Sequence, residues 1–135
     1  MLNRAVLIGR LTRDPEVSIS KKGDRERAVA RFSIAYNRRY RKGEEWVDEP
    51  HFFDVRAFGK LAKVIADRYH KGDLVFVEGR LSQDRWETEE GEKRSRITIV
   101  ADTVRLLRTK GESVTVEDAN GGGREDYEDE VDVDL

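Results

Sequence analysis

The side chains best suited to ligand chemistry in this sequence are aromatic rings that stand beside cations. The four rings are Tyr40, Phe52, Phe58 and Trp86. Their neighbouring cations are Arg39, Arg41, Arg56, Lys60 and Arg85. A single strand of nucleic acid offers phosphates on one side and unpaired base faces on the other, so a protein that holds it needs cations for the backbone and rings for stacking. The pattern therefore favours contact with a single-stranded nucleic acid.

Two of these rings also have a purely structural interpretation. Phe52 and Phe58 share one face of a strand, which a helix or another subunit would cover in a packed structure. Arg56 lies between them on the same face, and a dry face does not readily accept an unpaired guanidinium group. Both rings are therefore predicted to contact the ligand.

The other rings lie in charged hairpin segments. Tyr40 sits in the arginine-rich stretch at 38–41, and Trp86 directly follows Arg85. Such charged segments are rarely buried, so a place in the core is unexpected for either ring. Both rings are therefore predicted to contact the ligand, with packing on their own hairpins as the alternative. Trp46 is left open between these two roles, whereas Tyr69, at helical spacing, is expected in the core.

Catalytic chemistry finds little support in the sequence. His51 and His70 are the only histidines, the chain has no cysteine, and no cluster has metal-ligand spacing. Gly59 and Lys60 lack the earlier glycine and the following serine or threonine of a phosphate-binding loop. The acidic residues fall in loops or in the tail, where solvated carboxylates keep ordinary acidity. We therefore expect no enzyme activity, no metal site and no cofactor.

Alternation of apolar and polar residues predicts five principal strands. They cover residues 3–12, with a short continuation at Val17 and Ile19, and residues 27–36, 52–58, 74–86 and 94–107. Gly9 suggests a bulge or a close backbone approach. Helical spacing over 61–72 places one helix between the third and fourth strands, and segments 37–48 and 87–93 are expected as exposed hairpin loops. This order is that of the five-stranded OB-fold, an all-β Greek-key barrel.

The charge is divided unequally along the chain. Residues 1–110 carry 25 lysines and arginines against 18 aspartates and glutamates, whereas residues 111–135 carry one arginine against 10 acids. We expect an OB-fold domain over 1–108 and a disordered acidic tail over 109–135, because the tail buries too little apolar area to offset its ordering entropy. A basic domain indicates a polyanionic partner. No apolar run is long enough to cross a membrane, and the lack of cysteine favours the cytoplasm, in association with the nucleoid.

Several phrases carry a family resemblance. They are Asn3 with VLIGRLTRDPEV, then FGKLA, YHKGDLVFVEGRL and RWETEEGEKR, within roughly residues 3–107. In this order they resemble the bacterial single-stranded DNA-binding protein family, of the homotetrameric OB-fold type. The resemblance implies sequence-independent binding and protection of single-stranded DNA during replication, recombination and repair. It also implies a tetramer in which the first strand pairs across one interface, and it places the family's stacking aromatics on the same four rings.

The resemblance extends the set of predicted contacts. The predicted phosphate-binding residues are Arg4, Arg38, Arg41, Arg56, Lys60, Lys71 and Arg85, of which Arg4 and Lys71 rest on the resemblance alone. The family also docks replication and repair proteins on an acidic C-terminal tip. That tip corresponds to Asp132, Val133, Asp134 and Leu135, without the proline and phenylalanine that usually follow.

Two other classes of function stay open on the residues alone. An OB-fold of this size also suits a protein-docking subunit of a replication-restart complex, in which Trp86 and Tyr40 are interface residues. The spread of the aromatics over separate elements argues against that class. An RNA chaperone of the OB or cold-shock kind would prefer RNA through the 2′-hydroxyl group, and only the resemblance favours DNA over RNA.

Overall fold

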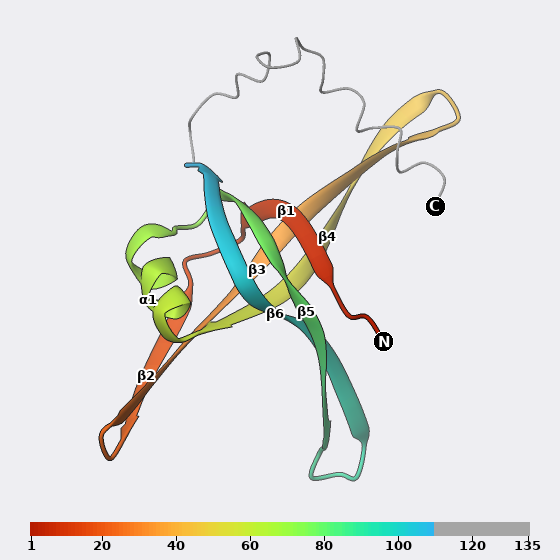
Figure 1. Cartoon of the computed structure of the whole chain (residues 1–135). Coiled ribbons are helices and arrows are strands. Elements are labelled where there is room, and N and C mark those ends of the chain that lie inside the picture. Colours follow the sequence, from red (N-terminus) through yellow and green to blue (C-terminus); the bar gives the residue numbers. More distant parts are fainter. Residues whose placement is uncertain (110–135) are drawn as a thin grey trace.

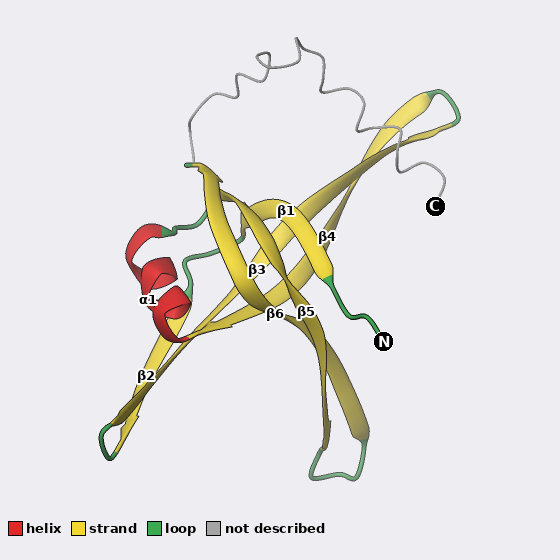
Figure 2. Cartoon of the chain, viewed as in Figure 1, coloured by secondary structure: helices red, strands yellow, loops and turns green. Residues whose placement is uncertain are grey.

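The computed structural model describes residues 1–109, which form six strands and one helix (Figures 1 and 2). The elements are β1 (Ala5–Leu11), β2 (Glu16–Lys22), β3 (Arg25–Lys42), β4 (Glu45–Phe58), α1 (Gly59–Arg68), β5 (Leu74–Glu87) and β6 (Lys93–Arg108). The predicted acidic tail falls almost wholly outside the described residues.

Five of the strands close into a barrel. The sheet order is β1-β5-β6-β4-β3-β2, and β1 also pairs with β3 through Arg10 with Ala35 and Leu11 with Ile34. The strand β2 pairs only with β3, within the described part of the chain, and lies outside the ring. This is the OB-fold topology, so the predicted fold class is confirmed. The helix was expected after the third strand but follows the fourth. The reason is that the segment around Val17 and Ile19, expected to continue the first strand, forms the separate strand β2.

The barrel interior is built by strict alternation along the strands. On β3, residues at even positions point inward and those at odd positions point outward. One end of the barrel is covered by α1 through Ala62 and Ile65, and Tyr69 donates a hydrogen bond from its hydroxyl to the Val104 carbonyl at 3.0 Å. Tyr69 is therefore a core residue, as expected. The fully enclosed side chains include Ala30, Ile34, Ala57, Val75 and Val77.

Two glycines allow backbones to approach closely. A Cβ atom on Gly9 would lie 2.5 Å from the Ala35 carbonyl oxygen, where β1 crosses β3. A Cβ atom on Gly79 would lie 2.1 Å from the Val100 oxygen, beside an irregularity in the β5–β6 ladder. The close approach predicted at Gly9 is confirmed, and neither position has room for a side chain.

Three hairpin arms project from the barrel (Figure 1). The β2–β3 and β5–β6 arms point to the same side of the molecule, and the β3–β4 arm points away from both. The prediction of a loop over 37–48 is wrong, because the β3–β4 ladder continues to Lys42 and Glu45 and turns at Gly43, whose φ is 67°. Both faces of this arm are solvated, so its strands lack the apolar face on which alternation depends. The loop expected at 87–93 is present, between Glu87 and Lys93.

Candidate nucleic-acid interface

The predicted rings on β4 lie on the side of the sheet that faces away from the core. Alternation turns Val55 and Ala57 into the barrel, and it turns Phe52, Arg56 and Phe58 outward. We call this side of the β3–β4 ladder the outer face. Phe52 is 63% exposed and Phe58 is 44% exposed, so α1 covers neither ring. The structural alternative of burial beneath the helix is thereby excluded for both.

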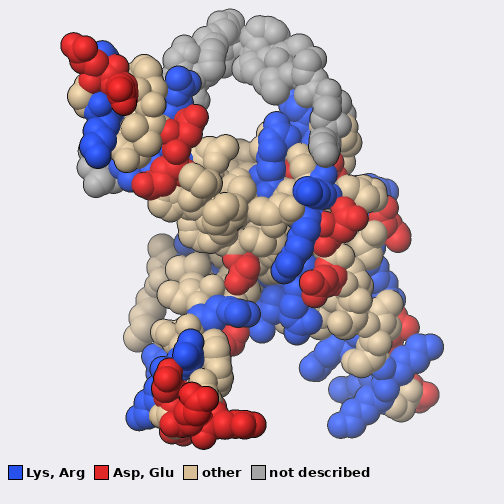
Figure 3. Space-filling model, turned by 180° about the vertical axis from the view of Figure 1, so that it is seen from behind, with Lys and Arg blue, Asp and Glu red and all other residues tan. Residues whose placement is uncertain are grey.

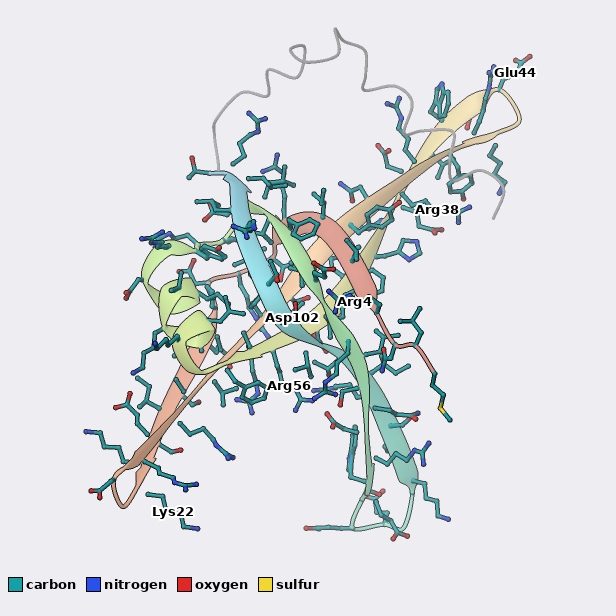
Figure 4. The ribbon with its side chains drawn as sticks, viewed as in Figure 1. Arg4, Lys22, Arg38, Glu44, Arg56 and Asp102 are labelled. Carbon is teal, nitrogen blue, oxygen red and sulfur yellow. The ribbon has the colours of Figure 1, made fainter. Side chains whose placement is uncertain are left out.

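Arg56 lies in a groove between the β2–β3 and β5–β6 arms (Figure 4). Seen from behind, lysines and arginines gather on the surface between these arms (Figure 3). The groove has a volume of about 470 Å³. Its lining residues are Arg13, Glu16, Arg31, Phe32, Asp54, Val55, Arg56, Asp84, Arg96 and Thr98. Four arginines against three carboxylates leave the groove with an excess of positive charge.

Most of the arginines in the groove are already paired with carboxylates. Arg56 lies 3.3 Å from Asp84, and Arg96 lies 4.0 Å from Asp54. The Nε atom of Arg56 is buried and has no hydrogen-bond partner among the described residues. Arg31 pairs with no carboxylate in that part of the chain. Arg13 also lies 3.9 Å from Glu16, so a phosphate entering the groove would meet one unpaired guanidinium group and three that are paired with carboxylates.

Phe58 borders a second hollow, of about 810 Å³, which is lined along the β2–β3 arm from Ala28 to Lys22. Lys22, Arg25 and Arg27 line it, together with Gly59. Lys22 lies near the tip of that arm, as Figure 4 shows. Sequence reasoning missed this basic arm as a contact surface. The available signal was the run of cations over 21–27, but only the pairing of β3 with β4 brings that run beside Phe58. Lys60, the next residue after Gly59, is exposed at the start of α1.

Trp86 lies on the β5–β6 arm and is 45% exposed. Arg94 stands opposite it in the ladder, and both line a hollow of about 440 Å³ that also includes Arg85. Asp84 and Trp86 share one face of β5, so the side of the arm that carries Trp86 continues from the groove. The turn that follows Trp86 is acidic, and its carboxylates repel phosphate. The acidic residues are Glu87, Glu89, Glu90 and Glu92.

Tyr40 lies on the opposite side of the β3–β4 ladder from Phe52. It is paired with Val47 and occupies an even position on β3. Even positions of β3 face the core where the strand passes through the barrel, so Tyr40 lies on the continuation of that inner side. The Arg38 guanidinium lies 4.8 Å from the Tyr40 ring centroid and 3.7 Å from Glu49. The structure therefore brings Phe52, Phe58 and Arg56 together but holds Tyr40 and Arg38 on the reverse side.

Two predicted phosphate contacts lie at the margin of the groove or away from it. Arg4 forms ion pairs with Glu78 and Asp102 on β5 and β6 (Figure 4). The hydrogen bond to Glu78 and its charge raise the pKa of the Arg4 guanidinium. Lys71 is exposed, and its backbone N–H donates to Asp14 at 2.8 Å, next to the segment that lines the groove. Lys71 is therefore close to the groove, whereas Arg4 is engaged elsewhere.

The described residues contain no group of three or more His, Cys, Asp or Glu side chains that could hold a metal ion. No helix within residues 1–109 is long and apolar enough to span a membrane. The predicted tail contacts at 132–135 lie outside the described residues.

The model of the single-strand binding protein family matches residues 2–107. The chain belongs to this family. Members of the family similar to it include the "Single-stranded DNA-binding protein" of Aquifex aeolicus, which is 48% identical over 87% of this chain and 79% of the relative. The Treponema pallidum protein of the same name is 46% identical over 78% of this chain and 58% of the relative. That of Borreliella burgdorferi is 39% identical over 88% and 78%. The family resemblance found in the sequence is confirmed.

Proposed function

We propose that this single-strand binding family member binds single-stranded DNA without sequence preference, across the outer face and the groove. One observation carries the proposal: two exposed rings, Phe52 and Phe58, flank Arg56 at the edge of a groove with excess positive charge. The relatives named above are single-stranded DNA-binding proteins, which supports the same ligand for this chain.

Base stacking and phosphate neutralisation divide the work of binding. Phe52, Phe58 and Trp86 stack on bases, and each stacked base contributes roughly 1 to 3 kcal/mol regardless of sequence. The cations around them neutralise phosphates and release counterions, so affinity falls as salt rises. These cations are Arg56, Lys60, Lys71 and Arg85. Tyr40, Arg38, Arg41 and Arg4 stay predicted contacts, which alanine variants test one by one.

The proposed binding of single-stranded DNA suggests a biological role. We propose that the protein coats exposed single strands during replication, recombination and repair, in the cytoplasm at the nucleoid, without a cofactor. We propose further that partner proteins dock on the acidic residues around Asp132 and Asp134. The basic charge of residues 1–110 and the acidic charge of the remainder support this division of labour.

We also propose that the chain forms a homo-oligomer, a tetramer by family resemblance. The strand β1 pairs with β5 along one edge, whereas its other edge pairs with β3 only at Arg10 and Leu11, within the described residues. Val6 and Ile8 are exposed beside this open edge, which suits pairing with a second copy. Phe53 is also partly exposed, so it is available to another subunit and is not a core residue of the single chain.

The test is a titration of intrinsic tryptophan fluorescence with an unstructured thymidine oligomer, with matched RNA and with duplex DNA, at low and high salt. Quenching by single-stranded DNA that persists at high salt supports the proposal, because stacking is less sensitive to salt than phosphate contact. Preference for RNA would favour the RNA-chaperone class. Equal quenching by every polyanion, abolished by salt, or no quenching at all would refute the proposal and favour a protein-docking role.

Phe58→Ala provides the site-specific test. The ring is exposed, so its removal should weaken binding about five- to 150-fold while the unfolding temperature stays near that of the parent. Val64→Ala, on the exposed side of α1, is the matched control. A variant that unfolds but retains residual affinity would show that Phe58 acts in packing instead.

A further inference from the structure

Three aromatic residues on β4 recur at six-residue intervals. They are Trp46, Phe52 and Phe58. The β3–β4 pairing runs without a register shift from Phe58 opposite Val29 to Glu45 opposite Lys42, so all three rings lie on the outer face. Six residues of strand span about 20 Å, which separates the rings evenly along the ladder.

Trp46 is 47% exposed, so its hairpin does not enclose it. Arg41 stands directly opposite in the ladder, with its guanidinium carbon 5.8 Å from the ring centroid. The Arg39 guanidinium carbon lies 5.1 Å from the same ring and is also within 3.8 Å of Asp48. Both distances are within cation–π range, so two cations hold the indole in place and concentrate positive charge around it.

The stretch between Trp46 and Phe52 is open to an extended ligand. On the outer face it carries Asp48 and Pro50 from β4, opposite Arg39 and Asn37 from β3. None of these four is a large apolar side chain that would interrupt the surface. The outer face therefore continues from the groove, past Phe52, to the end of the β3–β4 arm.

From this geometry we propose that Trp46, with Arg39 and Arg41, forms a further stacking site for single-stranded DNA near the tip of the β3–β4 arm. The proposal rests on the proposed function and adds a path: the strand leaves the groove at Phe52 and follows the outer face of the arm. Trp46 stacks on a base, while the two arginines pair with the flanking phosphates. Because Trp46 lies about 40 Å along the ladder from Phe58, a short oligomer held at Phe52 and Phe58 does not reach it.

The decisive experiment uses the two tryptophans of the chain as separate reporters. Trp86→Phe leaves Trp46 as the only tryptophan, and Trp46→Phe leaves Trp86. Each full-length variant is titrated with thymidine oligomers of increasing length, and anisotropy of labelled DNA reports binding independently. We expect the fluorescence of Trp46 to be quenched only by oligomers above a threshold length. The quenching of Trp86 should depend on oligomer length in a different way.

An affinity series provides the second measurement. Trp46→Ala should weaken binding of long oligomers about five- to 150-fold and leave short oligomers unaffected, with Val47→Ala on the reverse side of the arm as the matched control. Binding without any response of Trp46 at saturating long DNA, or equal losses in Trp46→Ala and Val47→Ala, would overturn the proposal and leave the proposed function intact. Absence of binding by anisotropy in the parent protein would overturn both.

Discussion

Replacing Asp84 by asparagine should strengthen binding of single-stranded DNA. Asp84 lies 3.3 Å from the Arg56 guanidinium, in the groove that we assign to the ligand. Its carboxylate already pairs with Arg56, so a phosphate that binds this guanidinium must first break the ion pair. Asparagine has nearly the same shape without the charge, which leaves Arg56 free and removes a repulsive group from the groove.

The expected gain is modest because the pair is partly solvated. The two side chains are 24% and 45% exposed, and ion pairs with this much access to water contribute about 0 to 1 kcal/mol. Removal of the repulsion between the carboxylate and a neighbouring phosphate adds a similar amount at low salt. A net gain of about 1 kcal/mol corresponds to roughly fivefold tighter binding.

The assay is an anisotropy titration of labelled thymidine oligomer at two salt concentrations. The gain should shrink at high salt, because the Debye length falls to about 3 Å at 1 M. Asp67→Asn is the matched control, since it removes the same charge from an exposed position on α1. Unchanged or weaker binding by Asp84→Asn, with normal unfolding, would refute the reasoning and indicate that Asp84 positions Arg56 for binding.

Three further predictions concern stability and assembly. Tyr69→Phe should lower stability by about 1 kcal/mol in thermal unfolding, through loss of the hydrogen bond to Val104. Burial raises the pKa of the Tyr69 hydroxyl, so the parent should lose stability as pH rises above about 10, and a variant that keeps this slope would contradict the assignment. Gly79→Ala should cost about 1 to 3 kcal/mol or prevent folding, because its Cβ meets backbone atoms, and a normal unfolding temperature would show that β5 can shift. Val6→Lys should reduce the oligomer mass measured by sedimentation, whereas an unchanged mass would place the interface elsewhere.

Much of the fold was predictable because the barrel strands have one buried side. Alternation from Ala28 to Ile34 identified the inward face of β3, and helical spacing identified Ile65 and Tyr69 as core residues. The exposed rings of Phe52 and Phe58 were recognisable from the arginine between them. These features depend on residues that are close together in the sequence, so they can be recognised from the sequence alone.

The arrangement of the charged arms could not be predicted in the same way. Whether Tyr40 shares a side with Phe52 depends on ladder register and turn length, and a turn longer by one residue would reverse the answer. Trp46 shares β4 with Phe52, but its side could not be predicted while residues 37–48 were expected to form a loop. The pairing of Arg56 with Asp84 joins β4 to β5, elements that α1 separates in the chain. Such contacts arise from barrel closure and have no local pattern.

Barrel closure itself has a consequence for dynamics. The strands β4 and β6 meet through only two parallel pairs, Val55 with Ile99 and Arg56 with Val100, whereas their other ladders are long. Transient local opening should therefore be easier at this seam than in the β3–β4 ladder, and amide hydrogen exchange should be correspondingly faster. A strand of DNA held by Arg56 on one side and Arg96 on the other would bridge the seam and slow that exchange. Ligand binding and closure of the barrel would then be thermodynamically linked, each favouring the other.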